Sequence, residues 1–121
     1  MSPLFERGTG PALIKVSTTD SIPGYENEEI LGIVTGEWVG GVNLFRDFFA
    51  GVRDIVGGRS ASLERALRDG REACLDDLRE SAYDLGAQAV VGIKFDYSPF
   101  NKMLLLAASG TAVRLIVERP R

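Results

Sequence analysis

The sequence predicts an α+β fold in which a small antiparallel sheet packs against one long and one shorter helix. The prediction comes from two stretches with helical spacing of apolar residues in the middle of the chain and from β-type stretches on either side of them. The expected order is therefore strand, strand, helix, helix, strand, strand. With 121 residues, of which 45% are hydrophobic, the chain is long enough to build one core without disulfides or structural metal.

Residues 1–11 contain two prolines and two glycines and show little apolar periodicity. We expect a flexible N-terminal arm here, followed by a single domain over residues 12–121.

Two strands are expected next, over residues 13–17 and 29–39. Gly32 and Gly36 interrupt the second of them. Glycine weakens a strand unless a bulge is needed or another backbone approaches closely. A subunit contact would supply such a reason.

Two helices are expected in the middle of the chain. Asn43 can cap a helix that runs to about Val56, and Ser60 can cap a longer one that runs to about Leu85. Gly86 then takes the C-terminal capping position, where a left-handed backbone is common. The apolar residues of the longer helix recur at helical spacing: Leu63, Leu67, Cys74, Leu78, Ala82 and Leu85.

The last two strands are expected over residues 87–97 and 102–117, with a turn over residues 98–101 between them. In the first of these strands, alternate positions are apolar and share one face, which is typical of a strand with one buried face: Ala89, Val91, Ile93 and Phe95.

The final strand contains Met103–Ala108, which is apolar on both faces. A strand with one solvated face should alternate apolar with polar residues. Because the long helix can cover only one side of the sheet, we expect the other side to be buried against a neighbouring subunit. Leu104 and Leu106 are therefore candidate interface residues.

Four blocks of the sequence, in order, resemble the YbjQ-like proteins, a bacterial family named for heavy-metal binding. The blocks are Thr18–Tyr25, Phe45–Asp47 continuing to Arg53–Ser60, Gly86–Gly92 and Ser109–Val113. The resemblance runs over residues 13–117. It implies a dodecin-like α+β subunit that closes into a homo-oligomeric ring, commonly a pentamer.

The charge balance disfavours two classes of partner. Charged residues make up 26% of the chain and the net charge is −3, so no basic field is present to attract nucleic acid or an anionic membrane. The single cysteine excludes an intrachain disulfide and favours a reducing, cytoplasmic setting. The sequence shows no secretory signal and no apolar run of membrane-spanning length.

The chain has no histidine and one cysteine, so a subunit cannot assemble the usual zinc, copper or cadmium coordination, and no cofactor is expected. Cys74 is interpreted as a small buried hydrophobe; the alternative is a ring that brings one Cys74 per subunit to its axis. A row of four carboxylates along the long helix could bind a hard cation but is interpreted as a solvated face. This row consists of Glu72, Asp76, Glu80 and Asp84.

The start of the long helix is a candidate anion site. Free backbone N–H groups, the helix dipole and a guanidinium could hold a phosphate or carboxylate there. The alternative is a capped turn without a ligand, and the spacing does not match a nucleotide-binding loop. The candidate residues are Gly57, Gly58, Arg59 and Ser60.

A set of acidic and arginine residues lies within the family-like blocks. Such residues often fix orientation at subunit contacts, where guanidinium groups bind carboxylates at two points. The interface candidates are Asp20, Arg46, Asp47, Arg53 and Asp54. We therefore expect a ring-forming binding or scaffold protein that holds a small ligand or ion at its interfaces. The alternative is an enzyme with a carboxylate/arginine site between subunits, which the absence of histidine disfavours; no catalytic residue is assigned.

Overall fold

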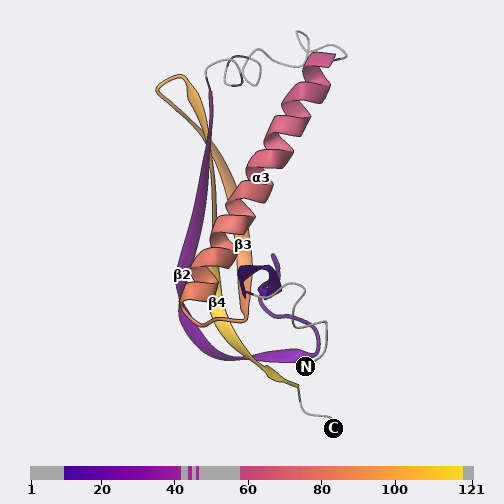
Figure 1. Cartoon of the computed structure of the whole chain (residues 1–121), viewed down its shortest axis with the longest axis vertical. Helices are drawn as coiled ribbons and strands as arrows, with labels where there is room; N and C mark the ends of the chain where they lie inside the picture. The colour runs from indigo at the N-terminus through magenta and orange to yellow at the C-terminus, as the bar shows by residue number, and fades with distance from the viewer. Residues whose placement is uncertain (1–9, 42–43, 45, 47–57, 119–121) are drawn as a thin grey trace.

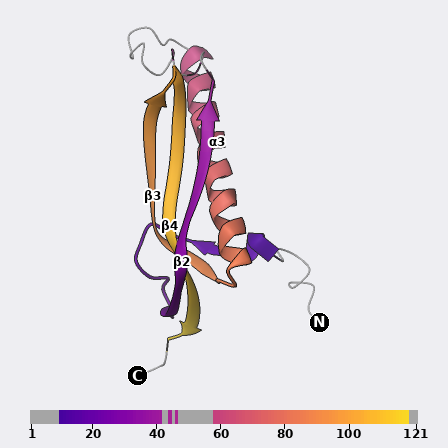
Figure 2. The same cartoon turned by 90° about the vertical axis from the view of Figure 1, so that its left-hand side faces the viewer.

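The computed structural model describes residues 10–41, Leu44, Arg46 and residues 58–118. One long helix lies diagonally across one face of a twisted sheet, and no helix of the described residues covers the opposite face (Figures 1 and 2). The elements are η1 (Gly10–Leu13), β1 (Lys15–Val16), β2 (Tyr25–Gly40), α3 (Gly58–Asp84), β3 (Ala89–Phe100) and β4 (Met103–Val117).

The sheet is mixed rather than antiparallel as predicted. Its strand order is β1-β3-β4-β2, and β4 pairs antiparallel with both β3 and β2. The two-residue strand β1 pairs parallel with β3, and Ser17 extends this pairing by donating its N–H to the Val90 carbonyl. The direction of so short a strand depends on a distant partner, so its own residues do not reveal it.

Strand β2 begins at Tyr25 and is longer than the predicted 29–39. Two irregularities in its pairing with β4 bend it, and Gly32 lies at the second of them. Gly36 faces α3 so closely that a Cβ there would collide with the Cys74 carbonyl oxygen and lie 2.9 Å from the Cβ of Asp77. The close backbone approach that this glycine indicated is made by the chain's own helix, not by another subunit.

Helix α3 begins at Gly58, so Ser60 is its third residue and not the predicted N-cap. At the other end the predicted glycine cap is confirmed. Gly86 has φ of 80°, its N–H donates to the Tyr83 carbonyl, and the Ala87 N–H donates to the Ala82 carbonyl. This pair of bonds satisfies two carbonyls that the helix end would otherwise leave open.

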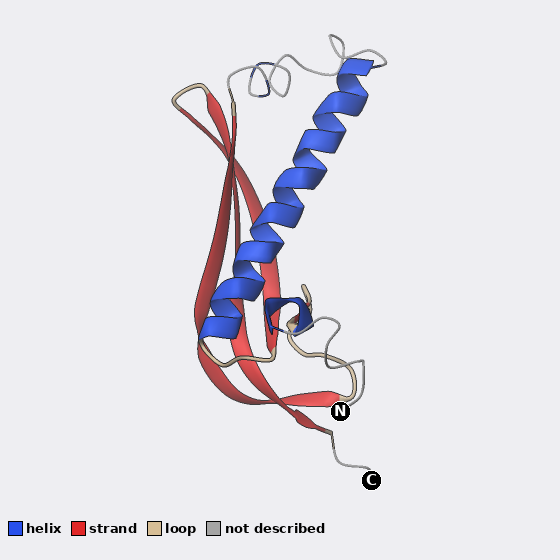
Figure 3. Cartoon of the chain, in the orientation of Figure 1, coloured by secondary structure: helices blue, strands red, loops and turns tan. Residues whose placement is uncertain are grey.

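The shorter helix predicted from Asn43 to Val56 falls largely outside the described residues. Leu44 and Arg46 are helical. The predicted arm is described from Gly10 onward, where η1 packs beside the C-terminal end of α3 (Figure 3).

The turn between β3 and β4 lies at Asn101 and Lys102, later than predicted. Both residues have positive φ, 50° and 59°, as in a two-residue hairpin turn of the primed type. Strand β3 continues through Pro99, which is tolerated on an edge strand because no further ladder bond is required of it.

The main core lies between α3 and the sheet. Cys74, Leu78 and Ala82 of α3 pack against strand residues that include Val34 and Leu106. Trp38 of β2 packs over Gly70, where a Cβ would lie 2.7 Å from the indole ring. Predicted helix positions Leu63 and Leu67 are half-buried, whereas Leu85 is exposed.

A smaller core covers one end of the opposite face. Ala89, Val91, Val113 and Leu115 are buried there, and Ile22 and Tyr25 pack against them. The segment between β1 and β2 thus covers this end of the sheet. In the part of the chain that the structure describes, no helix has the length and apolarity needed to cross a bilayer.

Candidate functional site

The face of the sheet away from α3 is the first candidate surface. Leu104 and Leu106 are fully buried within the subunit. Leu106 belongs to the core beneath α3, and Leu104, two residues earlier in β4, lies on the same face. If another copy of the chain contacts this strand, it would therefore meet the alternating residues Met103, Leu105 and Ala107 instead. These residues are half-buried on the opposite face.

Apolar side chains from the neighbouring strands extend this surface. Val39 pairs with Leu105, and Phe100 pairs with Met103, so both lie on the same face as these partners. Phe100 is 63% exposed and Ile33, opposite Thr111, is 80% exposed. We call these residues the open face: Ile33, Val39, Phe100, Met103, Leu105 and Ala107.

Both edges of the sheet are also open in the part of the chain that the structure describes. Strand β2 forms one edge over all of its 16 residues. At the other edge, β1 and the segment after it contact β3 only as far as Ile93, whose N–H donates to the Ser17 carbonyl. Among the described residues, no strand lies beside the rest of β3 on that side. Open edges carry unpaired backbone donors and acceptors, which invite pairing with another chain.

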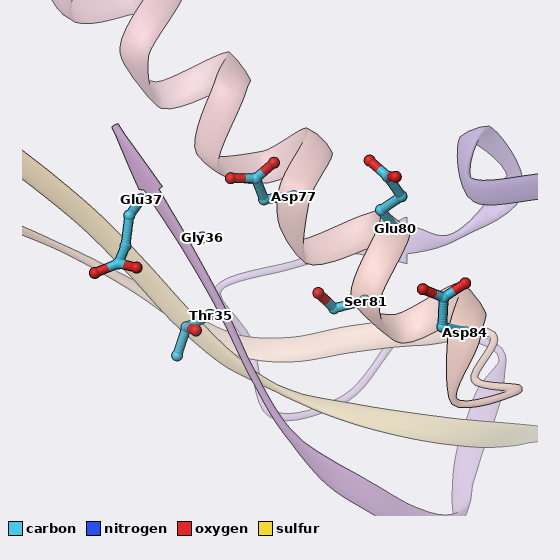
Figure 4. A pocket seen from close by; sticks show the side chains of 7 residues that line it. All are labelled: Thr35, Gly36, Glu37, Asp77, Glu80, Ser81 and Asp84. Atoms are coloured by element: carbon cyan, nitrogen blue, oxygen red, sulfur yellow. The ribbon is translucent and has the colours of Figure 1, made fainter. Parts of the chain in front are cut away.

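A groove of about 420 Å³ lies along β2 and the C-terminal part of α3, beside their close contact at Gly36 (Figure 4). Asp77 and Ser81 point from the helix toward the strand, whereas Thr35 and Glu37 point away from the helix (Figure 4). The residues that line the groove are Thr35, Gly36, Glu37, Asp77, Glu80, Ser81 and Asp84.

The carboxylates of this region do not converge on one point. Within the described ranges, no three side chains of His, Cys, Asp or Glu are placed to share a metal ion. The predicted row along α3 is exposed in all four of its members, and Asp76 forms an ion pair of 3.1 Å with Arg79. This arrangement supports the interpretation of the row as a solvated face.

Cys74 is the chain's only thiol, and its environment does not suit a metal ligand. The side chain is fully buried, and its Sγ lies 3.6 Å from the Leu106 carbonyl oxygen, to which the thiol donates. Burial, and then the carboxylates of Asp77 and Glu37, raise the pKa of the thiol. Metals bind the thiolate, which this site disfavours.

The burial of Cys74 also argues against the alternative in which a ring brings one Cys74 from each subunit to its axis. A side chain enclosed between α3 and its own sheet cannot reach a symmetry axis. The residues of one subunit therefore do not fit a soft metal ion.

We expect the purified protein to hold well below one equivalent of zinc or cadmium per subunit after exchange into metal-free buffer, because the described part of the chain offers one protonated thiol and no partner ligand. Elemental analysis by mass spectrometry measures this. Stoichiometric metal that disappears in Cys74→Ser would contradict the expectation.

The predicted anion site is described only in its backbone. Gly58, Arg59 and Ser60 form the first turn of α3, while Gly57 and the side chains of this turn lie outside the described residues.

Of the predicted charged set, the structure describes Asp20 and Arg46, and these two do not share a site within one subunit. Asp20 lies before β2 and Arg46 beyond its other end. Strand β2 spans roughly 50 Å, given a rise of ~3.3 Å per residue over 16 residues. Asp20 contributes its backbone carbonyl to a 3.0 Å hydrogen bond from Asn27. The remaining members, Asp47, Arg53 and Asp54, lie outside the described residues.

Sequence reasoning missed a second cleft, of about 360 Å³, at the end of the molecule where η1 and β1 meet α3. Its residues come from five separate segments, so no pattern along the chain marks them. They are Gly10, Leu13, Ile14, Lys15, Tyr25, Tyr83, Ala87, Gln88, Leu115 and Val117.

Comparison with known proteins places this fold in a family. A crystal structure of a protein of unknown function from Pediococcus pentosaceus, assigned to the DUF74 family, matches with a TM-score of 0.58 and 13% identity, covering 85% of this chain and 98% of that one. At this identity the likeness shows the fold alone. The YbjQ family model, described as "Putative heavy-metal-binding", matches residues 14–116. That span confirms the resemblance seen in the four sequence blocks, and the chain belongs to the YbjQ family.

Proposed function

We propose that this chain is a ring-forming binding or scaffold protein whose subunits meet through the open face and the open edges of the sheet. The observation that carries the proposal is the open face itself. Val39 and Phe100 are largely exposed beside their pairing partners on β4, the half-buried Leu105 and Met103, and no helix of the described residues covers them. Contiguous apolar surface of this kind usually marks an interaction site.

The two open edges favour a ring over a two-fold dimer. The β2 edge is long and continuous, whereas the β3 edge is short, begins beyond Ile93 and contains Pro99. Unlike surfaces join head to tail, and head-to-tail contacts that close make rings. A closed ring also leaves no edge exposed. The resemblance to the YbjQ-like family implies a ring that is commonly a pentamer, and we adopt five subunits.

We expect Leu105→Asp to shift the protein from a closed oligomer toward folded monomers, because an unpaired charge in an apolar contact costs several kcal/mol. Native mass spectrometry and light scattering coupled to size exclusion measure the mass. Circular dichroism checks that the fold is retained, since Leu105 does not belong to the subunit core.

Ala61→Asp is the matched control, because it adds the same charge at an exposed position on α3. It should leave the mass unchanged. A monomeric parent protein at micromolar concentration would refute the assembly. An unchanged oligomer in Leu105→Asp would show that the open face is not the contact.

A further inference from the structure

The second cleft combines exposed apolar side chains with the cationic side chain of Lys15. Leu13 is 56% exposed, Tyr83 is 50% exposed and Val117 is 68% exposed, and all three line it. Its volume of about 360 Å³ lies near the lower end of the range for small-molecule sites, ~300–1,000 Å³. These features indicate a concave apolar wall that is left in contact with water.

Among the described residues that line this cleft, Lys15 is charged and no carboxylate is present. Its Nζ lies 5.6 Å from the centre of the Tyr25 ring, so a cation–π contact holds the ammonium at the cleft. An ammonium in a cleft whose described lining holds no acid favours an anionic group of a ligand.

Gln88 supplies a second donor beside Lys15. The backbone N–H of Lys15 donates to the Gln88 carbonyl over 3.1 Å, so the two residues are neighbours. The Gln88 side-chain oxygen accepts a 2.8 Å hydrogen bond from the Leu115 N–H, which orients the amide. The amide nitrogen of Gln88 then remains available to donate, together with the ammonium, to one carboxylate or phosphate.

We infer that this cleft binds a small organic anion with an apolar body. The anionic group would meet Lys15 and Gln88, and the apolar body would cover Leu13, Tyr83 and Val117. The site uses residues of one subunit only, so it does not depend on the proposed ring. It also differs from a metal site, because its charged group repels cations.

The test uses hydrocinnamate, an aryl carboxylate, and its uncharged amide as matched probes of the full-length protein. Two-dimensional amide NMR titrations should place the shift changes around the cleft, and the carboxylate should bind about tenfold more tightly than the amide, the effect of one charge-assisted contact. Lys15→Gln should abolish that difference. Tyr83→Ala should weaken both probes by the same factor, because it removes only the apolar wall.

Lys94→Gln is the matched control, since it removes the same charge from an exposed position of β3. It should keep the preference for the carboxylate. Equal affinity for the two probes, the same loss in Lys94→Gln, or no binding up to the solubility limit would overturn the inference. Binding seen only in dissociated Leu105→Asp would place a neighbouring copy in the cleft and would overturn it too.

Discussion

Leu106→Asp should leave the protein unfolded at neutral pH. The Leu106 side chain is 0% exposed to solvent, and it lies in the core beneath α3 with Cys74 and Leu78. Loss of a buried leucine costs about 2–5 kcal/mol, and an unpaired buried carboxylate adds several more. The total approaches the whole stability of an ordinary domain, about 5–15 kcal/mol.

Circular dichroism and urea unfolding measure the effect, with Leu105→Asp as the matched control. The two residues are adjacent in β4 but point to opposite faces. The control should keep the circular dichroism spectrum of the parent while its oligomeric mass falls. A cooperative unfolding transition at parental urea concentration in Leu106→Asp would show that the assigned faces of β4 are reversed.

Gly36→Ala should destabilise the protein by about 3 kcal/mol, the upper part of the range for overpacking. The new Cβ would meet the backbone carbonyl of Cys74 and the Cβ of Asp77, and neither is the flexible end of a side chain. Relief would require α3 to move away from β2, which would open the packing of Trp38 on Gly70 as well. Thermal and urea unfolding measure the change.

Gly41→Ala is its control, because a Cβ at Gly41 meets no atom within 4 Å. This variant should unfold at the same urea concentration as the parent or slightly higher, since alanine restricts the unfolded chain. Equal stability of the two variants would mean that α3 does not pack on β2 as closely as the structure shows.

Local patterns were enough to predict the long helix, its glycine cap and the three long strands. Helical spacing, a left-handed glycine and alternating apolar residues act within a few residues of one another, so they can be read along the chain. The four blocks that resemble the YbjQ family were recognisable for the same reason. The composition alone was also enough to argue against a soft-metal site, because the chain has one cysteine and no histidine.

Contacts between distant segments decided the rest. The parallel direction of β1, the side of the sheet to which Leu104 and Leu106 belong, and the reason for Gly36 each depend on where α3 and β3 lie relative to residues far away in sequence. The cleft around Lys15 likewise gathers five segments. The sequence therefore determined which elements form, because their signals are local, while only the tertiary structure decided which faces are buried, because burial is a property of packed partners.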